Sequence, residues 1–184
     1  MDSVVILVVV AVVAVVAGVL LAGFVVSRRR REQGERQEQA RQEYGPEYER
    51  AVEESGSERK AEEEIRERRE RVEGEVQPLP DESRRRYAEE WESVEKTFVD
   101  DPAKALDEAD RVVAEIMSER NFPTDSREEA SKGLGVMHSD VAEDFRKAQE
   151  VHAEAAGSSD GEDLEKMRRA IQEYRSVYER LTEG

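Results

Sequence analysis

The sequence predicts an all-α protein with an N-terminal transmembrane helix, a charged helical connector and a small C-terminal helical bundle. Three observations lead to this prediction. A run of 23 residues, Val4–Val26, contains no charged or amide side chain. From residue 81 onward, apolar residues recur at the spacing of amphipathic helices. Outside the first run, no stretch alternates β-branched and polar residues as a strand would. The expected parts are an anchor at 1–27, a connector at 28–80 and an acidic bundle at 81–184.

The run Val4–Val26 is long enough to cross a bilayer. As an α-helix it would span roughly 34 Å, against about 30 Å for a hydrocarbon core. A cleaved signal peptide is the alternative, but signal peptides have a basic start and a shorter apolar core. The residues before the run, Met1, Asp2 and Ser3, include no basic side chain. We therefore expect an uncleaved signal anchor, from Val4 to Val26, in the cell membrane.

Four consecutive arginines, Arg28, Arg29, Arg30 and Arg31, follow the apolar run. Basic residues beside a membrane span are retained on the cytoplasmic side. We therefore expect a single-pass protein with its N-terminus outside and residues 27–184 in the cytoplasm. The same guanidinium groups can bind anionic lipid headgroups, at about 1 kcal/mol for each basic residue near the surface. A role in topology alone explains them equally well, so both interpretations stay open.

Ala14, Gly18 and Ala22 are spaced by four residues and share one face of the predicted membrane helix. Small residues at this spacing let two membrane helices approach closely. They are therefore the candidate contact face of a homodimer. Alanine and glycine are frequent in this segment, however, so such a spacing also arises by chance.

Residues 32–75 predict charged helices with interruptions. Gly45 and Pro46 mark one interruption, because proline suits the first turn of a helix and disfavours helix in the residue before it. Ser57 is the expected N-cap of a further helix that reaches Val72. Apolar residues in that helix are few, so we expect a semi-rigid, solvated spacer without a core of its own. The sequence leaves open whether this spacer docks on the bundle.

The distal bundle is predicted from the apolar faces of four main helices, with a shorter helix between the second and third. The expected inward-facing residues are Tyr87, Trp91, Val94 and Phe98 in the first helix, Ala105, Leu106, Ala109, Val112, Val113, Ile116 and Met117 in the second, Val141, Phe145 and Ala148 in the third, and Leu164, Met167, Ile171, Tyr174, Tyr178 and Leu181 in the last. A domain of roughly 100 residues can support one small core of this kind.

Polar and glycine residues set the expected helix boundaries in the bundle. Asp101, which precedes a proline, is the expected N-cap of the second helix. The pair Ser126 and Glu129 has the spacing of a capping box and predicts the start of the short helix. We expect that helix to end near Gly133 or Gly135, because glycine often terminates helices.

Composition excludes several kinds of site. The formal net charge is −16, and residues 76–184 hold 16 Lys/Arg against 28 Asp/Glu. Such an acidic domain repels phosphate backbones, so we expect no nucleic acid partner. The chain has no cysteine, which excludes disulfides, thiolate metal sites and thiol nucleophiles.

The sequence contains no recognisable catalytic, cofactor-binding or metal-ligating pattern. His138 and His152 do not have a metal-binding spacing. The acid-rich stretches "DDPAKALDEAD" and "SSDGEDLE" do not match a calcium-binding loop and are explained as acids near helix N-termini. Gly133-Leu134-Gly135 lies after a helix rather than after a strand, so it is interpreted as a break and not as a phosphate loop. We therefore expect no enzyme activity, no cofactor and no metal.

Three stretches, "YGPEYERAVEESG", "LPDESRRRYAEEW" and "FVDDPAKALDEADRVVAEIM", resemble segments of a family of small, uncharacterised single-pass membrane proteins of high-GC Gram-positive (actinobacterial) bacteria. The likeness covers most of residues 40–180, and Tyr44–Tyr48 is its most distinctive part. The resemblance implies a bacterial membrane protein but no particular activity or site residues. Tyr44–Tyr48 is interpreted as a helix break, with a docking element as the functional alternative.

The expected function is that of a membrane-anchored adaptor, scaffold or regulator that presents an acidic helical domain to the cytoplasm. The expected partners are membrane lipids and a protein of unknown identity, whose basic groups would complement the acidic surface, and a homodimer is possible through the small-residue face. Two alternatives stay open. One is a helical protein of the cell envelope, facing outward, and the other is a membrane enzyme with an unrecognised carboxylate site.

Overall fold

The structure is a computed structural model and describes residues 34, 38–155 and 161–183. The chain divides into two compact units, residues 1–42 and 43–184, and the second is described below. Its helices are α2 (Pro46–Ser55), α3 (Glu58–Glu75), α4 (Asp81–Asp100), α5 (Pro102–Glu119), α6 (Arg127–Met137), α7 (Ser139–Ala155) and α8 (Gly161–Glu183). The described residues include no strand, so the all-α fold class is confirmed for this part of the chain.

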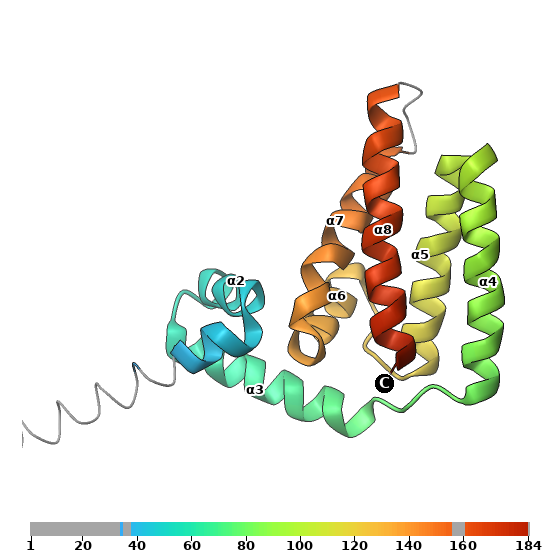
Figure 1. The fold of residues 1–184 in the computed structure, drawn as a ribbon. Coiled ribbons are helices and arrows are strands. Elements are labelled where there is room, and N and C mark those ends of the chain that lie inside the picture. The colour runs from blue at the N-terminus through green and yellow to red at the C-terminus, as the bar shows by residue number, and fades with distance from the viewer. Residues whose placement is uncertain (1–33, 35–37, 156–160, 184) are drawn as a thin grey trace, which may run out of the picture. The chain divides into compact units, whose positions relative to one another are not determined.

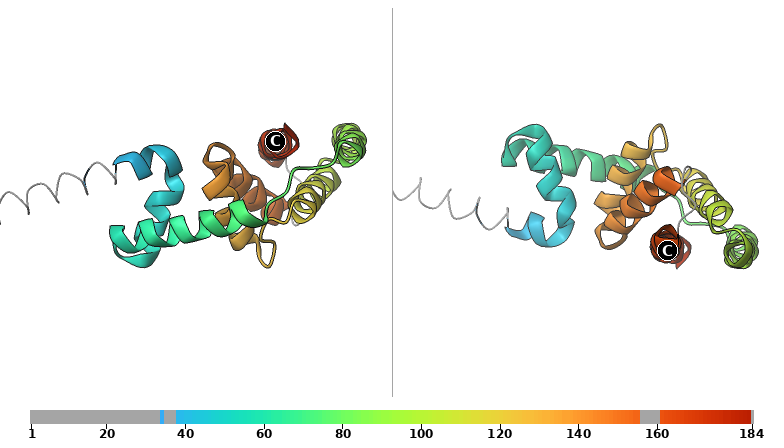
Figure 2. Two further views of the ribbon diagram at one scale, coloured as in Figure 1. Left: turned by 90° about the horizontal axis from the view of Figure 1, so that it is seen from below. Right: turned by 90° about the horizontal axis from the view of Figure 1, so that it is seen from above.

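Helices α7, α8, α5 and α4 lie side by side in that order (Figure 1). Helix α8 packs on both α7 and α5, and α4 packs on the other side of α5. Figure 2 shows this row end-on from both directions. Helix α6 packs against α7, and its contact with α3 connects the row to the first helices of the unit.

The core lies between α5, α7 and α8, where the sequence pattern predicted it. All seven inward-facing positions predicted in the second helix of the bundle are buried in α5. In α8, Tyr174 and Leu181 are buried as expected, and the ring of Tyr174 meets Phe145 edge-on with centroids 6.4 Å apart. Leu164 is the exception, because it is exposed near the start of α8, where that helix reaches past the ends of α4 and α5 in Figure 1. The prediction of an inward Leu164 was wrong.

Two of the three predicted N-caps make their capping hydrogen bond, whereas Ser57 holds the N-cap position of α3 without one. The side chain of Asp101 accepts a hydrogen bond from the Lys104 amide over 3.1 Å, and that of Ser126 accepts one from the Glu129 amide over 3.1 Å. Helix α5 ends at Glu119, and Asn121, two residues later, has a left-handed φ of 61°. Asparagine tolerates this conformation better than most residues, so the chain can reverse there before the next helix.

Helices α2 and α3, called the arm below, pack against the other helices of the unit. They pack on each other, α3 packs on α6, and α2 contacts both α6 and α7. The arm buries these apolar side chains: Tyr48, Ala51, Ala61, Ile65 and Val72. The docking that the sequence left open is therefore present. The division into a connector at 28–80 and a bundle at 81–184 stays a prediction.

The short helix of the bundle is longer than predicted. Helix α6 runs through Gly133 and Gly135 to Met137, and His138 is its C-cap. The prediction that either glycine ends this helix was wrong. The two glycines serve close packing, as the neighbouring side chains show below.

Several sequence predictions concern residues that the structure does not describe. The anchor Val4–Val26, the arginines Arg28–Arg31 and the small-residue face of Ala14, Gly18 and Ala22 all lie outside the described residues. Within the described part, no helix combines the length and the apolar character that a membrane crossing requires.

Candidate functional site

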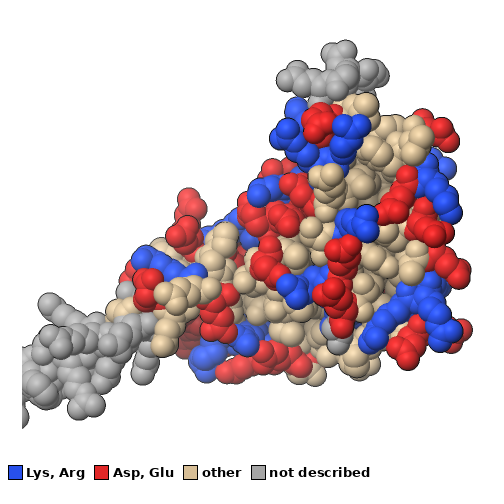
Figure 3. Space-filling view, in the orientation of Figure 1, with Lys and Arg blue, Asp and Glu red and all other residues tan. Residues whose placement is uncertain are grey.

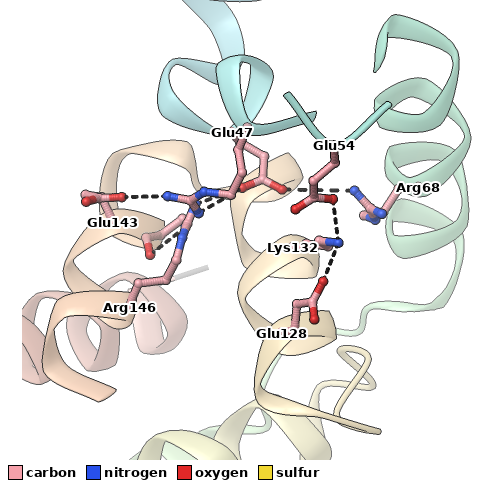
Figure 4. A network of polar contacts seen from close by, with 9 residues as sticks. Glu47, Glu54, Arg68, Glu128, Lys132, Glu143 and Arg146 are labelled. Carbon is pink, nitrogen blue, oxygen red and sulfur yellow. Dashed lines mark hydrogen bonds and ion pairs between the residues drawn. The ribbon is translucent and has the colours of Figure 1, made fainter. Parts of the chain in front are cut away.

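A seam of charged side chains joins the arm to α6 and α7. Its members project from α2 and α3 on one side and from α6 and α7 on the other (Figure 4). The seam is defined by the residues Glu47, Arg50, Glu54, Arg68, Glu128, Lys132, Glu143 and Arg146. One of its hydrogen bonds joins positions 99 residues apart in sequence, so only the folded chain assembles it.

Glu47, in the first turn of α2, is the buried centre of the seam and is only 3% exposed. Arg146 donates a hydrogen bond from Nη2 to Glu47 Oε2 over 2.8 Å. Arg68 Nη1 lies 4.0 Å from Oε1, and Arg50 Nη1 lies 3.8 Å from Oε2. Burial raises the pKa of the Glu47 carboxyl, and the positive charges of Arg50 and Arg68 partly oppose that rise. Burial of an unpaired carboxylate would be strongly unfavourable, so these arginines make the position tolerable.

Two glycines of α6 provide the space that this packing needs. A Cβ at Gly135 would lie 3.0 Å from both Cγ and Cδ of Glu47, which is closer than side-chain carbons normally approach. A Cβ at Gly133 would lie 2.5 Å from Cγ of Pro123. The glycines therefore let the Glu47 side chain and the α5–α6 connection lie directly against the α6 backbone, and this explains why α6 continues through both.

Lys132 and Arg50 carry the outer ion pairs of the seam. Lys132 Nζ lies 2.8 Å from Oε2 of Glu54 and 2.6 Å from Oε1 of Glu128. Burial alone would lower the pKa of the Lys132 ammonium, but its hydrogen bonds to Glu128 and Glu54 reverse the effect and raise that pKa. Arg50 Nη2 donates to Glu143 Oε2 over 3.2 Å. These contacts tie α2 to α6 and α7 at the surface.

A groove of about 490 Å³ opens beside the seam, between α2, α6 and α7. It is lined by Arg50, Glu54, Arg127, Glu128, Ser131, Lys132, Arg146, Gln149, Glu150 and Ala153. Four of these side chains are basic and three are acidic, which contrasts with the strongly acidic balance of the whole chain. This is the concave surface at which polar groups from three helices converge.

A second polar cluster joins α4 to the end of α5. The Glu119 carboxylate accepts hydrogen bonds from Ser83 Oγ, from Arg86 Nη2 over 2.7 Å and from Tyr87 Oη over 2.9 Å. The hydrogen bond from Ser83, with those from Tyr87 and Arg86, lowers the pKa of the Glu119 carboxyl. Burial and the carboxylate of Glu119 raise the pKa of Tyr87 to about 12. This cluster fixes α4 on α5.

Arg120 closes the base of the unit. Its side chain is buried and donates to the backbone carbonyls of Gln77, over 3.0 Å, and Leu181, over 2.7 Å. The Gln77 amide donates in return to the Arg120 carbonyl over 2.9 Å. Burial lowers the pKa of the guanidinium, with a smaller effect from Arg84. One arginine thus joins the end of α5, the segment after the arm and the end of the chain's last helix.

The two histidines lie in different surroundings. His138 is half-buried between α6 and α7, where burial and the nearby Arg120 lower its pKa. The Nε2 atom of His152 lies 2.7 Å from Asp107 Oδ1, and Asp110 accepts a hydrogen bond from Tyr174 over 2.8 Å. Within residues 38–155 and 161–183, no group of three or more His, Asp or Glu side chains has the geometry to hold a metal ion.

The sequence did not single out the seam. Glu47 is visible there only as an acid in the first turn of a helix, which the helix dipole favours without any tertiary partner. Its partners Arg68 and Arg146 belong to charge-rich helices in which nothing distinguishes them. The usable signal was the pair Gly133 and Gly135, because glycine inside a helical pattern indicates close approach of another group. None of the site residues predicted from the sequence belongs to the seam.

Comparison of the chain with protein-family models, with curated protein sequences and with solved structures gives no match. The resemblance to small actinobacterial membrane proteins therefore stays a prediction from the three stretches that carry it. A functional proposal has to rest on the residues and on the geometry of the helical unit.

Proposed function

We propose that this chain is a single-pass membrane protein that holds a helical, non-enzymatic binding module close to the cytoplasmic face of the membrane. The anchor is the apolar run Val4–Val26, and Arg28–Arg31 fix its orientation and contact anionic headgroups. The module is the unit of residues 43–184, which acts as an adaptor, scaffold or regulator.

The docking of the arm is the observation that carries this proposal. Because the compact unit begins at Glu43, only the chain from Arg31 to Glu43 connects it to the membrane. Even fully extended, that connection reaches about 40 Å, at roughly 3.3–3.6 Å per residue. With an undocked arm whose two helices stay folded, the tether would extend to the start of α4, and its reach would be roughly 120 Å. The docked arm thus favours a partner that lies at or in the same membrane.

The charge pattern supports binding to a partner with basic groups. Acidic and basic side chains are interspersed over the face shown in Figure 3, and acidic residues predominate in the chain as a whole. Complementary charge accelerates encounter and selects among partners more than it adds affinity. A basic juxtamembrane segment of another membrane protein would meet both requirements, that of charge and that of short reach.

Substituted-cysteine labelling tests the topology, because the natural chain has no cysteine to interfere. Single variants Glu53→Cys and Glu183→Cys introduce thiols at exposed positions in the helical unit. In intact cells, a membrane-impermeant maleimide should leave both unlabelled, and permeabilisation should expose them. The matched variant Ser3→Cys should be labelled in intact cells. Labelling of positions 53 and 183 from outside would instead establish the outward-facing alternative.

Photocrosslinking tests the binding role in native membranes. A photoreactive residue at Glu92, exposed on α4, should give a covalent adduct with another membrane protein, and the same residue at Ser3 should not give that adduct. Raising the salt concentration before irradiation should weaken the adduct, since encounter between complementary charges is screened by salt. If scanning of exposed positions along all helices of the unit gives no adduct with another protein, the module is not a binding module.

A further inference from the structure

We propose that the groove between α2, α6 and α7 binds a small phosphate-bearing anion, either a free phosphorylated molecule or the headgroup of an anionic lipid. Its volume of about 490 Å³ lies within the range of roughly 300–1,000 Å³ that is typical of small-molecule sites. The groups that line it come from three helices, so their arrangement depends on the docked arm. The proposal concerns the groove alone and is independent of membrane topology.

Two basic side chains of the groove are buried more deeply than two of its acidic ones. The side chains of Lys132 and Arg146 are 13% and 16% exposed, whereas those of Glu54 and Glu128 are 45% and 71% exposed. The two glutamates reach inward to Lys132 Nζ over 2.8 Å and 2.6 Å. Their carboxylate oxygens occupy the place that phosphate oxygens would take. Figure 4 shows both carboxylates at the Lys132 ammonium. Because both glutamates are substantially exposed, they can turn into solvent when an anion enters.

Arg146 lines the groove and is held in place by two hydrogen bonds. Its Nη2 donates to Glu47 over 2.8 Å and its Nη1 to the carbonyl of Ala142 over 3.1 Å. Its Nε is buried and has no hydrogen-bond partner among the described residues. Arg146 therefore contributes a fixed guanidinium to the lining of the groove.

The acidic surroundings determine which anion can bind. The net charge of −16 opposes every anion, but charges beyond about 8 Å are largely screened at physiological ionic strength. Near the groove, an entering anion must displace Glu54 and Glu128 from Lys132. A phosphate monoester carries about 1.5–2 negative charges at pH 7 and three acceptor oxygens, and can therefore replace two carboxylates. Chloride and simple carboxylates cannot, so the groove selects phosphate.

The test is a titration of the full chain in nanodiscs of zwitterionic phosphatidylcholine, at constant ionic strength. A fluorophore at Ala153→Cys, exposed at the edge of the groove, reports binding of inorganic phosphate or glycerol 3-phosphate. We expect a saturable response, weakened at least tenfold by Lys132→Met. The control Lys147→Met removes a lysine of α7 that does not line the groove, and should leave the response unchanged.

A second variant separates ligand binding from folding. Glu128→Gln removes a carboxylate that competes with the ligand for Lys132, so it should tighten phosphate binding several-fold. A purely structural role for this ion pair would give no such gain. Weaker binding in Glu128→Gln, or no saturation up to roughly 10 mM phosphate in the unsubstituted chain, overturns the proposal.

Nanodiscs that contain phosphatidic acid, a lipid whose headgroup is a phosphate monoester, distinguish the two sources of phosphate. If the ligand is a lipid headgroup, these nanodiscs should produce the fluorescence change without added phosphate, and Lys132→Met should abolish it. If the ligand is a free molecule, only soluble phosphates should produce the change. A response in neither case, or one that Lys132→Met leaves intact, would show that the groove is not an anion site.

Discussion

The α-carbon of Gly135 on α6 lies directly against the side chain of Glu47 on α2, so closely that a Cβ at position 135 would stand 3.0 Å from both Cγ and Cδ of the glutamate. The missing methyl group gives Glu47 a place against the α6 backbone, 2.8 Å from the guanidinium of Arg146. A glycine inside a helix costs about 1 kcal/mol relative to alanine. At this position the cost is offset by the docking of the arm, which needs the space.

Substitution of Gly135 by alanine should therefore destabilise the protein. Alanine would gain up to about 1 kcal/mol in helix propensity, but overpacking against a side chain held by Arg146 typically costs about 1–3 kcal/mol. We expect a net loss of about 1 kcal/mol in the free energy of unfolding, measured by urea denaturation. The control Gly74→Ala, near the end of α3 with nothing within 4 Å of the added Cβ, should be neutral or stabilising. Equal gains in the two variants would contradict the packing role of Gly135.

Removal of the Glu47 carboxylate should loosen the arm. Glu47→Ala leaves Arg146 and Arg68 without their buried counter-charge, and breaking a buried pair in this way costs about 3–5 kcal/mol. Limited proteolysis should then cut within α2 and α3 before it cuts the rest of the unit. Glu54→Ala, which removes an exposed partner of Lys132, should cost less than about 1 kcal/mol. In the Glu47→Ala background, Gly135→Ala should no longer destabilise the protein. If it still did, the added Cβ would clash with a group other than Glu47.

The attachment of α4 to α5 should weaken in acid because of Glu119. Its pKa is lowered in the folded state by the hydrogen bond from Ser83 and those from Tyr87 and Arg86. Its contribution to stability is therefore present above the pKa of the unfolded chain, about 4.3, and is lost as the pH falls below that value through the folded pKa. Glu119→Gln should cost about 1–2 kcal/mol at pH 7 and flatten this acid dependence. Fluorescence of Trp91, the only tryptophan, follows unfolding, because its ring is buried on α4 and stacks on Tyr178 at 4.7 Å. If Glu119→Gln leaves the dependence of stability on acid pH unchanged, Glu119 is not the group that weakens the protein in acid.

Arg120→Met should destabilise the whole base of the unit. Methionine fills a similar volume but leaves the carbonyls of Gln77 and Leu181 without their charged donor. Hydrogen bonds from charged groups contribute about 1.5–3 kcal/mol each, so the loss of both should cost about 3–6 kcal/mol in urea denaturation. Hydrogen exchange at the end of α8 should accelerate in the same variant. Arg85→Met, at an exposed position of α4, is the matched control and should change stability by less than about 0.5 kcal/mol. A similar loss in both variants would mean that Arg120 acts only through general charge.

The sequence predicted best where the determining interactions are local or follow a helical period. The apolar face of α5 repeats every three or four residues, and each cap joins a side chain, that of Asp101 or Ser126, to the amide three residues later. The structure contains this face and both caps. The prediction failed at Leu164, whose burial depends on how far neighbouring helices extend. It failed again at Gly133 and Gly135, where the reason for the glycine lies on another element, Pro123 and Glu47 respectively.

By itself, the sequence determined that the described part of this chain is helical, where most of its helices begin, and which faces of the bundle helices turn inward. These properties follow from backbone caps and from apolar periodicity, both of which are written in consecutive residues. Only the tertiary structure decided that the arm docks, and that Glu47 is the charged residue buried with Arg146. A surface glutamate and a buried one are identical in a list of residues, and what separates them here is a set of arginines and a glycine brought together from helices distant in the chain. The need for a glycine at position 135 is therefore visible only in the tertiary structure, and the amphipathic pattern of a single helix does not predict it.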